Sequence, residues 1–157
     1  MGSGILWDVY MELIEPIASR VPYMVTVGNH EYDYHGPHPN PSGEPMWAPQ
    51  DEPGHAGGWG IGTQDSRGEC GVPTAARFDG TGNGNGIFWY SFDEGLVHVV
   101  MLSSEHDWRP GSAMYAWLQA DLAAVDRSAT PWVVLNTHRM MYTTQLGEEG
   151  DKAVSLA

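Results

Sequence analysis

The stretch from residue 24 to 31, Met-Val-Thr-Val-Gly-Asn-His-Glu, constrains the fold more than any other part of the chain. An apolar, β-branched run predicts a buried strand over Tyr23–Val27, and Gly28 allows a sharp turn directly after it. Three polar side chains follow, and ligands collect at strand ends in open α/β sheets. The Asn29 amide oxygen suits a divalent cation, and the His30 imidazole can move a proton near neutral pH. A plain Gly-Asn turn explains the same residues equally well.

Two further segments repeat this pattern of an apolar run followed by polar residues. Residues 132–135 predict a buried strand that ends in Asn136, Thr137, His138 and Arg139. Residues 96–102 predict another strand, which is followed by Ser103, Ser104, Glu105, His106 and Asp107. The cluster around His106 either contacts a site or forms a capped turn, and the residues alone do not decide between the two.

The remaining pattern is that of an α/β chain in which helices and strands alternate. Apolar spacing predicts a helix over residues 5–19, kinked or interrupted at Pro16. Residues 87–92 and 96–102 predict a hairpin, within which His98 is expected to be a satisfied cross-strand histidine. Ser112 is a suitable N-cap for a helix that reaches Asp126. That helix should pack on the core through the stripe Tyr115, Leu118, Leu122 and Val125.

A long segment between residues 33 and 86 interrupts this alternation. It contains 13 of the 20 glycines and 7 of the 11 prolines, with few aliphatic residues. Such a run predicts a poorly ordered functional loop, because it buries little apolar surface to offset its conformational entropy. His35, His38 and His55 fall within it, and their spacing matches no closed metal site. They are therefore expected to be solvated loop histidines.

Length, apolar content and net charge limit the kinds of partner that the chain can bind. Its 157 residues, 41% of them apolar, fit one domain with a packed core. A formal net charge of −13 repels nucleic acids and anionic membranes, and the longest apolar runs have only strand length. The same charge repels phosphate esters unless bound cations reverse the local field, so phosphate chemistry here requires a metal ion.

Four blocks of sequence resemble the purple acid phosphatases, a branch of the calcineurin-like metallophosphoesterases. They lie in the order of that family and cover more than half of the chain. The blocks are WDVYMELIEPIASRVPYMVTVGNHE (7–31), GECGVPTAARF (68–78), FWYSFDEGLVHVVMLSSEHDW (88–108) and YAWLQADLAAVDRSATPWVVLNTHRMMY (115–142). A single Gly-Asn-His-Glu would be weak evidence, whereas four blocks in register are strong.

This resemblance implies an αββα-type β-sandwich flanked by helices and a dinuclear centre of iron with zinc, manganese or a second iron. In such a centre a metal-activated hydroxide attacks a phosphate monoester. By resemblance, Asn29 and His138 bind the same metal ion, and their side chains should converge within about 5 Å. His30 contacts the phosphate or protonates the leaving alkoxide. Glu31 orients His30 or the loop, Arg139 supports phosphate or pairs with an acid, and His106 is a further candidate near the substrate.

The family's other ligand motifs do not occur in this sequence. Asp-x-Gly and Gly-Asp-x-x-Tyr would precede Asn29, and Gly-His-x-His would follow His138. The resemblance therefore places residues 1–157 in the central part of one catalytic domain, incomplete at both ends. With only two neutral ligands, this chain alone should bind metal weakly and lack phosphatase activity. A non-catalytic scaffold that serves as a binding domain is the alternative function. The family is largely secreted or vacuolar, and the sequence indicates neither localisation nor oligomeric state.

Overall fold

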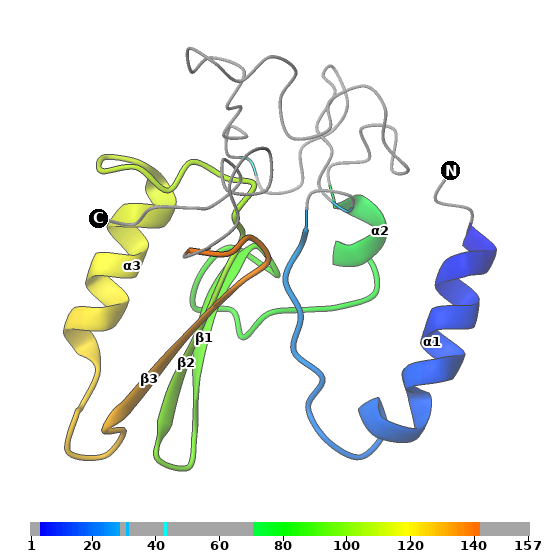
Figure 1. Cartoon of the computed structure of the whole chain (residues 1–157), viewed down its shortest axis with the longest axis horizontal. Coiled ribbons are helices and arrows are strands. Elements are labelled where there is room, and N and C mark those ends of the chain that lie inside the picture. Colours follow the sequence, from blue (N-terminus) through cyan, green and yellow to red (C-terminus); the bar gives the residue numbers. More distant parts are fainter. Residues whose placement is uncertain (1–3, 29–30, 32–42, 44–70, 142–157) are drawn as a thin grey trace.

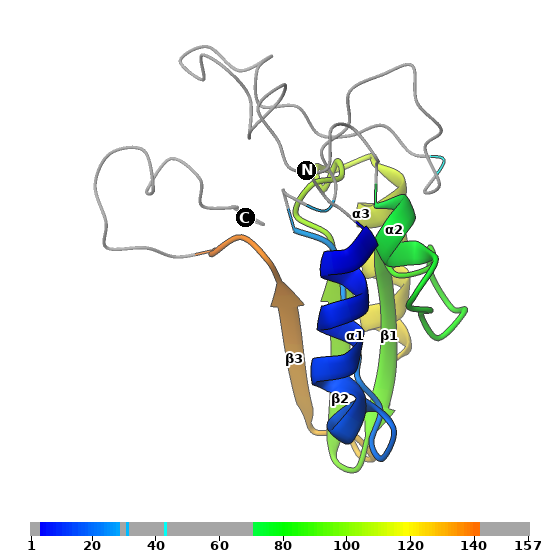
Figure 2. The same cartoon turned by 90° about the vertical axis from the view of Figure 1, so that its right-hand side faces the viewer.

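The computed structural model of the protein describes residues 4–28, 31, 43 and 71–141. They form a sheet that lies between two helices, α1 on one side and α3 on the other (Figures 1 and 2). In chain order the elements are α1 (Gly4–Ala18), α2 (Val72–Ala75), β1 (Trp89–Glu94), β2 (Val97–Leu102), α3 (Ala113–Ala124) and β3 (Trp132–Thr137). The α/β class predicted from the sequence is confirmed, and the described part contains one sheet.

The sheet has the strand order β1-β2-β3 and combines two kinds of connection. β1 and β2 form the predicted antiparallel hairpin, closed by Gly95 with a φ of 58°. β2 and β3 run parallel and are joined through α3, and the last pair in their register is Leu102 with Thr137. Parallel neighbours bring their carboxyl ends to the same edge of the sheet, so the residues after Leu102 and Thr137 emerge together.

Helix α3 covers one face of the sheet and begins at the predicted cap. The Ser112 hydroxyl accepts a hydrogen bond from the Tyr115 backbone N–H at 3.2 Å, which satisfies one of the free donors at the helix start. The predicted apolar stripe is only partly right. Leu118 is buried together with Met114, whereas Leu122 is exposed. Met114 and Leu118 pack on core residues of the hairpin, namely Ile87, Phe88, Trp89, Val100 and Leu102.

Helix α1 forms as predicted, but Pro16 does not interrupt it. The helix continues to Ala18, although Pro16 lacks the N–H that would bond to the Glu12 carbonyl. Ile14 is the buried residue of this helix, Trp7 and Met11 are half-buried, and the remaining large apolar side chains are exposed. They are Ile5, Leu6, Val9, Tyr10, Leu13 and Ile17.

Two expectations about strands are wrong. Residues 23–27 do not pair as a strand. Their hydrogen bonds to the hairpin segment are made by side-chain hydroxyls instead of by a backbone ladder. The Tyr90 hydroxyl donates to the Val25 carbonyl at 2.8 Å, and the Thr26 hydroxyl donates to the Phe88 carbonyl at 3.4 Å. The segment 132–135 is a strand, but it is half exposed rather than buried, because β3 is the edge of the sheet.

The glycine-rich turn before β1 is anchored, contrary to the disorder expected for residues 33–86. The Asn83 side chain accepts from the Ser91 N–H and donates to the Ser91 carbonyl and hydroxyl, while Trp117 Nε1 donates to the Asn83 carbonyl at 2.7 Å. Gly84 approaches β1 so closely that an added Cβ would lie 2.1 Å from the Trp89 carbonyl oxygen. Apart from residues 43 and 71–86, this segment lies outside the described residues, as do the three loop histidines. None of the described helices combines the length and apolar character needed to cross a membrane.

Candidate functional site

Three polar segments meet at one edge of the sheet, where β2 and β3 end. They are the turn after Val27, the residues that follow Leu102, and the residues that follow Thr137. In Figures 1 and 2 this edge is the upper one, and the N-terminal end of α3 lies there too. Open α/β sheets place ligands at such an edge.

Gly28 and His138 are in direct contact at this edge. A Cβ added to Gly28 would lie 3.0 Å from both Cγ and Nδ1 of the His138 ring. The sequence suggested that residue 28 is glycine because the turn needs backbone angles that other residues rarely adopt, but the φ of Gly28 lies outside the left-handed region. The requirement is space, because Glu31 Oε2 and the His138 ring occupy the position that a Cβ at residue 28 would need. Two polar turns that are about 110 residues apart in sequence therefore touch.

Glu31 is hydrogen-bonded to the backbone at two points. Its carboxylate Oε2 accepts a hydrogen bond from the Gly28 N–H at 3.1 Å, and its carbonyl accepts from the Gly71 N–H at 2.8 Å. Asn29 and His30 themselves lie outside the described residues. The predicted convergence of Asn29 with His138 therefore stays a prediction, supported by the contact that the preceding residue makes.

Arg139 pairs with an acid, which was one of its two expected roles. Its Nε and Nη2 donate to the two carboxylate oxygens of Glu105 at 2.7 and 2.9 Å. Both side chains are buried, with 7% and 2% of their surfaces exposed. The Ser104 hydroxyl completes the cluster: it donates to Glu105 Oε1 at 3.0 Å and accepts from the Arg139 N–H at 3.3 Å.

His106 lies in the core rather than on the open edge. Its Nδ1 is 2.8 Å from the Ser103 hydroxyl, and its ring packs at 5.1 and 5.3 Å from the rings of Phe88 and Trp89. Burial lowers the pKa of His106 to about 3, so the imidazole is neutral at the pH of most assays. It borders a cavity of about 270 Å³ next to the first turn of α3. The cavity is lined by Trp89, His106, Asp107, Gly111, Ser112, Ala113 and Met114.

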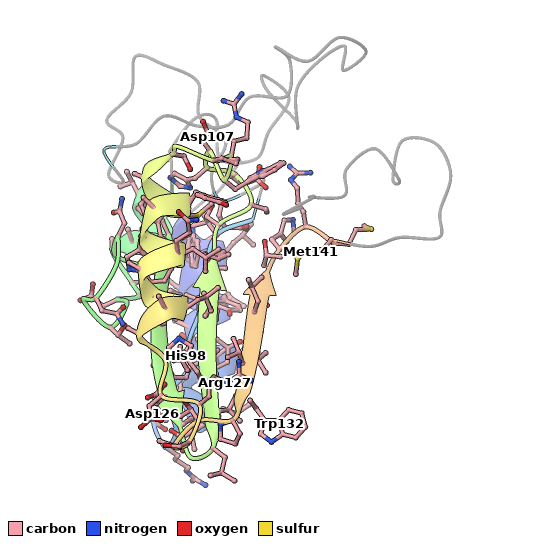
Figure 3. The ribbon with its side chains drawn as sticks, turned by 90° about the vertical axis from the view of Figure 1, so that its left-hand side faces the viewer. His98, Asp107, Asp126, Arg127, Trp132 and Met141 are labelled. Atoms are coloured by element: carbon pink, nitrogen blue, oxygen red, sulfur yellow. The ribbon has the colours of Figure 1, made fainter. Side chains whose placement is uncertain are left out.

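His98 stands at the opposite end of the sheet from Asp107, near the hairpin turn (Figure 3). Its Nδ1 lies 2.6 Å from Asp93 and its Nε2 lies 3.0 Å from Asp121, so it is the satisfied cross-strand histidine that the sequence predicts. Burial alone would lower the pKa of His98, but hydrogen bonds to Asp121 and Asp93 and their negative charges raise it above the usual value.

The raised pKa of His98 predicts that this network stabilises the fold more at acidic pH. Because the folded state favours the protonated ring, the contribution is complete below the unfolded pKa of about 6.5 and is lost as pH rises through the folded pKa. Replacing His98 by glutamine should therefore lower the free energy of unfolding by about 1.5 kcal/mol at pH 5.5 and by less at pH 8.5.

Urea denaturation of wild type and His98→Gln at both pH values checks this expectation. Wild type and variant are compared at the same pH. The lowered pKa of His106 makes stability rise with pH in both proteins, and this shared contribution cancels in the difference. A variant that loses equal stability at the two pH values would contradict the assignment.

The donor set at the open edge fits part of a metal site. His138 is an exposed imidazole at a strand end, held against the turn that leads into an amide side chain. Within residues 4–28, 31, 43 and 71–141, no group of three or more His, Cys, Asp or Glu side chains is placed to hold a metal ion. Of the two predicted ligands, Asn29 and His138, the described part of the chain includes only His138, and its metal binding stays a prediction.

The sequence did not single out Ser104 or pair Glu105 with Arg139. The sequence does show an acidic residue, Glu105, after one predicted strand and a basic residue, Arg139, after the next. In this register such residues emerge at the same edge. Recognising the pair required knowing that residues 97–102 and 132–137 lie side by side.

Comparison with known proteins gives a consistent result. The model of the calcineurin-like phosphoesterase family matches residues 2–156. An Arabidopsis thaliana protein named "Probable inactive purple acid phosphatase 9" is 41% identical, over 91% of this chain and 22% of its own length. "Purple acid phosphatase 22" of Arabidopsis thaliana is 38% identical, over 93% of this chain and 28% of its own length.

A solved structure matches in three dimensions as well. The purple acid phosphatase PPD1 from seeds of yellow lupin (Lupinus luteus) superposes with a TM-score of 0.71 at 34% identity, over 96% of this chain and 23% of that chain. The present chain thus spans between a fifth and a third of the length of these relatives.

Proposed function

Because the chain belongs to the calcineurin-like phosphoesterase family, we propose that it forms the central part of a phosphatase catalytic domain and supplies ligands to its metal centre. In this proposal Asn29 and His138 bind one metal ion and His30 is the proton donor. The observation that carries it is the contact between Gly28 and the His138 ring, which joins the two polar turns.

The chemistry that such metal ions supply is neutralisation of the phosphate oxygens and activation of a water molecule, here with iron paired with zinc, manganese or a second iron. The chain's own residues provide what surrounds it. His138 offers a ring nitrogen on the sheet edge, Glu31 fixes the turn through the Gly28 N–H, and His30 delivers a proton to the leaving oxygen of a phosphate monoester. A net charge of −13 makes these cations necessary for an anionic substrate to approach.

Zinc binding by the whole chain tests this assignment. Calorimetric titration at pH 7.5 should give one weak site whose affinity falls at least about tenfold in Asn29→Ala and in His138→Ala. His35→Ala, His38→Ala and His55→Ala are the matched controls and should bind as wild type does. Loss of affinity in the loop variants, with none in His138→Ala, would move the site to the loop and refute the proposal.

The names of the relatives favour a second candidate, a non-catalytic scaffold. A protein at 41% identity is named as inactive, whereas another at 38% identity is named simply as a phosphatase. Hydrolysis of an aryl phosphate at acidic pH by the full-length protein separates the two functions. Metal-dependent turnover that disappears in His138→Ala supports the enzyme, and zinc binding without turnover supports the scaffold.

A further inference from the structure

His138 lies just beyond the end of an edge strand. β3 is an edge strand with alternating exposed and half-exposed residues, and its pairing with β2 ends at Thr137. His138 follows directly, with an exposed side chain. A residue just beyond the end of an edge strand is where a chain ordinarily frays, because few buried contacts oppose local opening.

The next residue adds a constraint on the backbone of His138. Arg139 is buried, its guanidinium makes two hydrogen bonds to Glu105, and its own N–H is bonded to the Ser104 hydroxyl. Paired bonds between arginine and a carboxylate fix direction as well as distance. His138 is therefore bracketed by the last ladder pair on one side and by the buried ion pair on the other.

We propose that the Glu105–Arg139 pair is a positioning device for His138, which it holds against Gly28 as a ligand of the metal centre. The inference rests on the proposed function. Because the Arg139 guanidinium is buried against Glu105, Arg139 acts on the site through the backbone of His138 and not by contact with phosphate. Stability alone gives little reason for such a pair, because well-packed apolar residues stabilise a core as well as a buried ion pair does.

The test measures the order of the His138 backbone in the metal-free chain. Amide ¹⁵N relaxation should give His138 an order parameter near the rigid value of about 0.85 in wild type and below about 0.6 in Glu105→Gln and Arg139→Lys. Thr137, within the ladder, should stay rigid in all three proteins. Asp107→Asn is the matched control, since Asp107 forms the same paired contact with Arg109 at an exposed position. An ordered His138 in both folded variants would overturn the inference.

The double variant Glu105→Met with Arg139→Met covers the case in which a single substitution prevents folding. Two methionines refill the buried space without directional bonds, so the chain should fold while His138 becomes mobile. If His138 stays rigid in this variant, the pair only fills space and the inference fails.

Zinc titration of the same variants separates this inference from the proposed function. Glu105→Gln should weaken zinc binding roughly 10- to 100-fold, the usual effect of losing a residue that orients a ligand. An unchanged affinity in a variant with a mobile His138 would show that the pair does not serve the metal site. Absence of zinc binding in wild type would instead overturn the proposed function, whereas the order parameters would still decide whether the pair positions His138.

Discussion

Replacing Glu105 by alanine is expected to lower the free energy of unfolding by about 3–5 kcal/mol. The substitution leaves the Arg139 guanidinium buried, with neither carboxylate oxygen to accept its Nε and Nη2 hydrogen bonds. An uncompensated charge in the interior costs far more than the pair contributes over an apolar substitute. Urea denaturation followed by tryptophan fluorescence measures the loss.

Asp107→Ala is the matched control for this experiment. Asp107 binds Arg109 through the same two donors at 2.9 Å, yet half of the arginine side chain is exposed. Exposed pairs contribute about 0.2–1 kcal/mol, so the control should lose no more than about 1 kcal/mol. Equal losses in the two variants would contradict the buried pairing of Glu105 with Arg139.

Gly28→Ala is expected to weaken zinc binding about tenfold or more while leaving the fold nearly unchanged. The added Cβ would lie 2.9 Å from Glu31 Oε2 and 3.0 Å from the His138 ring, distances at which one of the two side chains must move. Both are side chains rather than backbone, so the sheet can keep its geometry. The cost falls instead on the orientation of the ligand, and misorientation typically costs 10- to 100-fold in metal affinity.

Calorimetric zinc titration and urea denaturation of Gly28→Ala measure the two effects separately. Gly4→Ala is the control, because a Cβ added there meets no atom within 4 Å. Zinc affinity in Gly28→Ala equal to that of wild type would show that the contact between Gly28 and His138 is irrelevant to binding.

The parts of the fold that could be predicted are those set by local chemistry. The Ser112 side chain caps α3 by accepting a hydrogen bond from the backbone N–H of Tyr115, and the hairpin of β1 and β2 closes on a glycine turn. The periodicity of residues 5–19 predicted α1. The environment of two further segments was predicted wrongly. Apolar runs predicted buried strands at residues 23–27 and 132–135, but an unpaired segment and an edge strand have the same composition.

The candidate site was predictable in its ligand chemistry and not in its supports. His138 stands where the sequence places it, at a strand end. The role of Gly28 depends on an approach between segments about 110 residues apart, and the pairing of Glu105 with Arg139 depends on the register of two parallel strands. Neither relation can be recognised in the local sequence, and for that reason the sequence leaves two roles open for Arg139.

If the segments after Val27 and Thr137 share one metal ion, as proposed, substoichiometric Mn²⁺ should broaden the amide signals of both, because signals within a short radius of the ion disappear first. The signals of Gly28 and His138 should broaden together, while those of Gly95 and Trp132, at the opposite end of the sheet, persist. Broadening centred on the acidic pair Asp93 and Asp121, with Gly28 and His138 unaffected, would contradict the proposal.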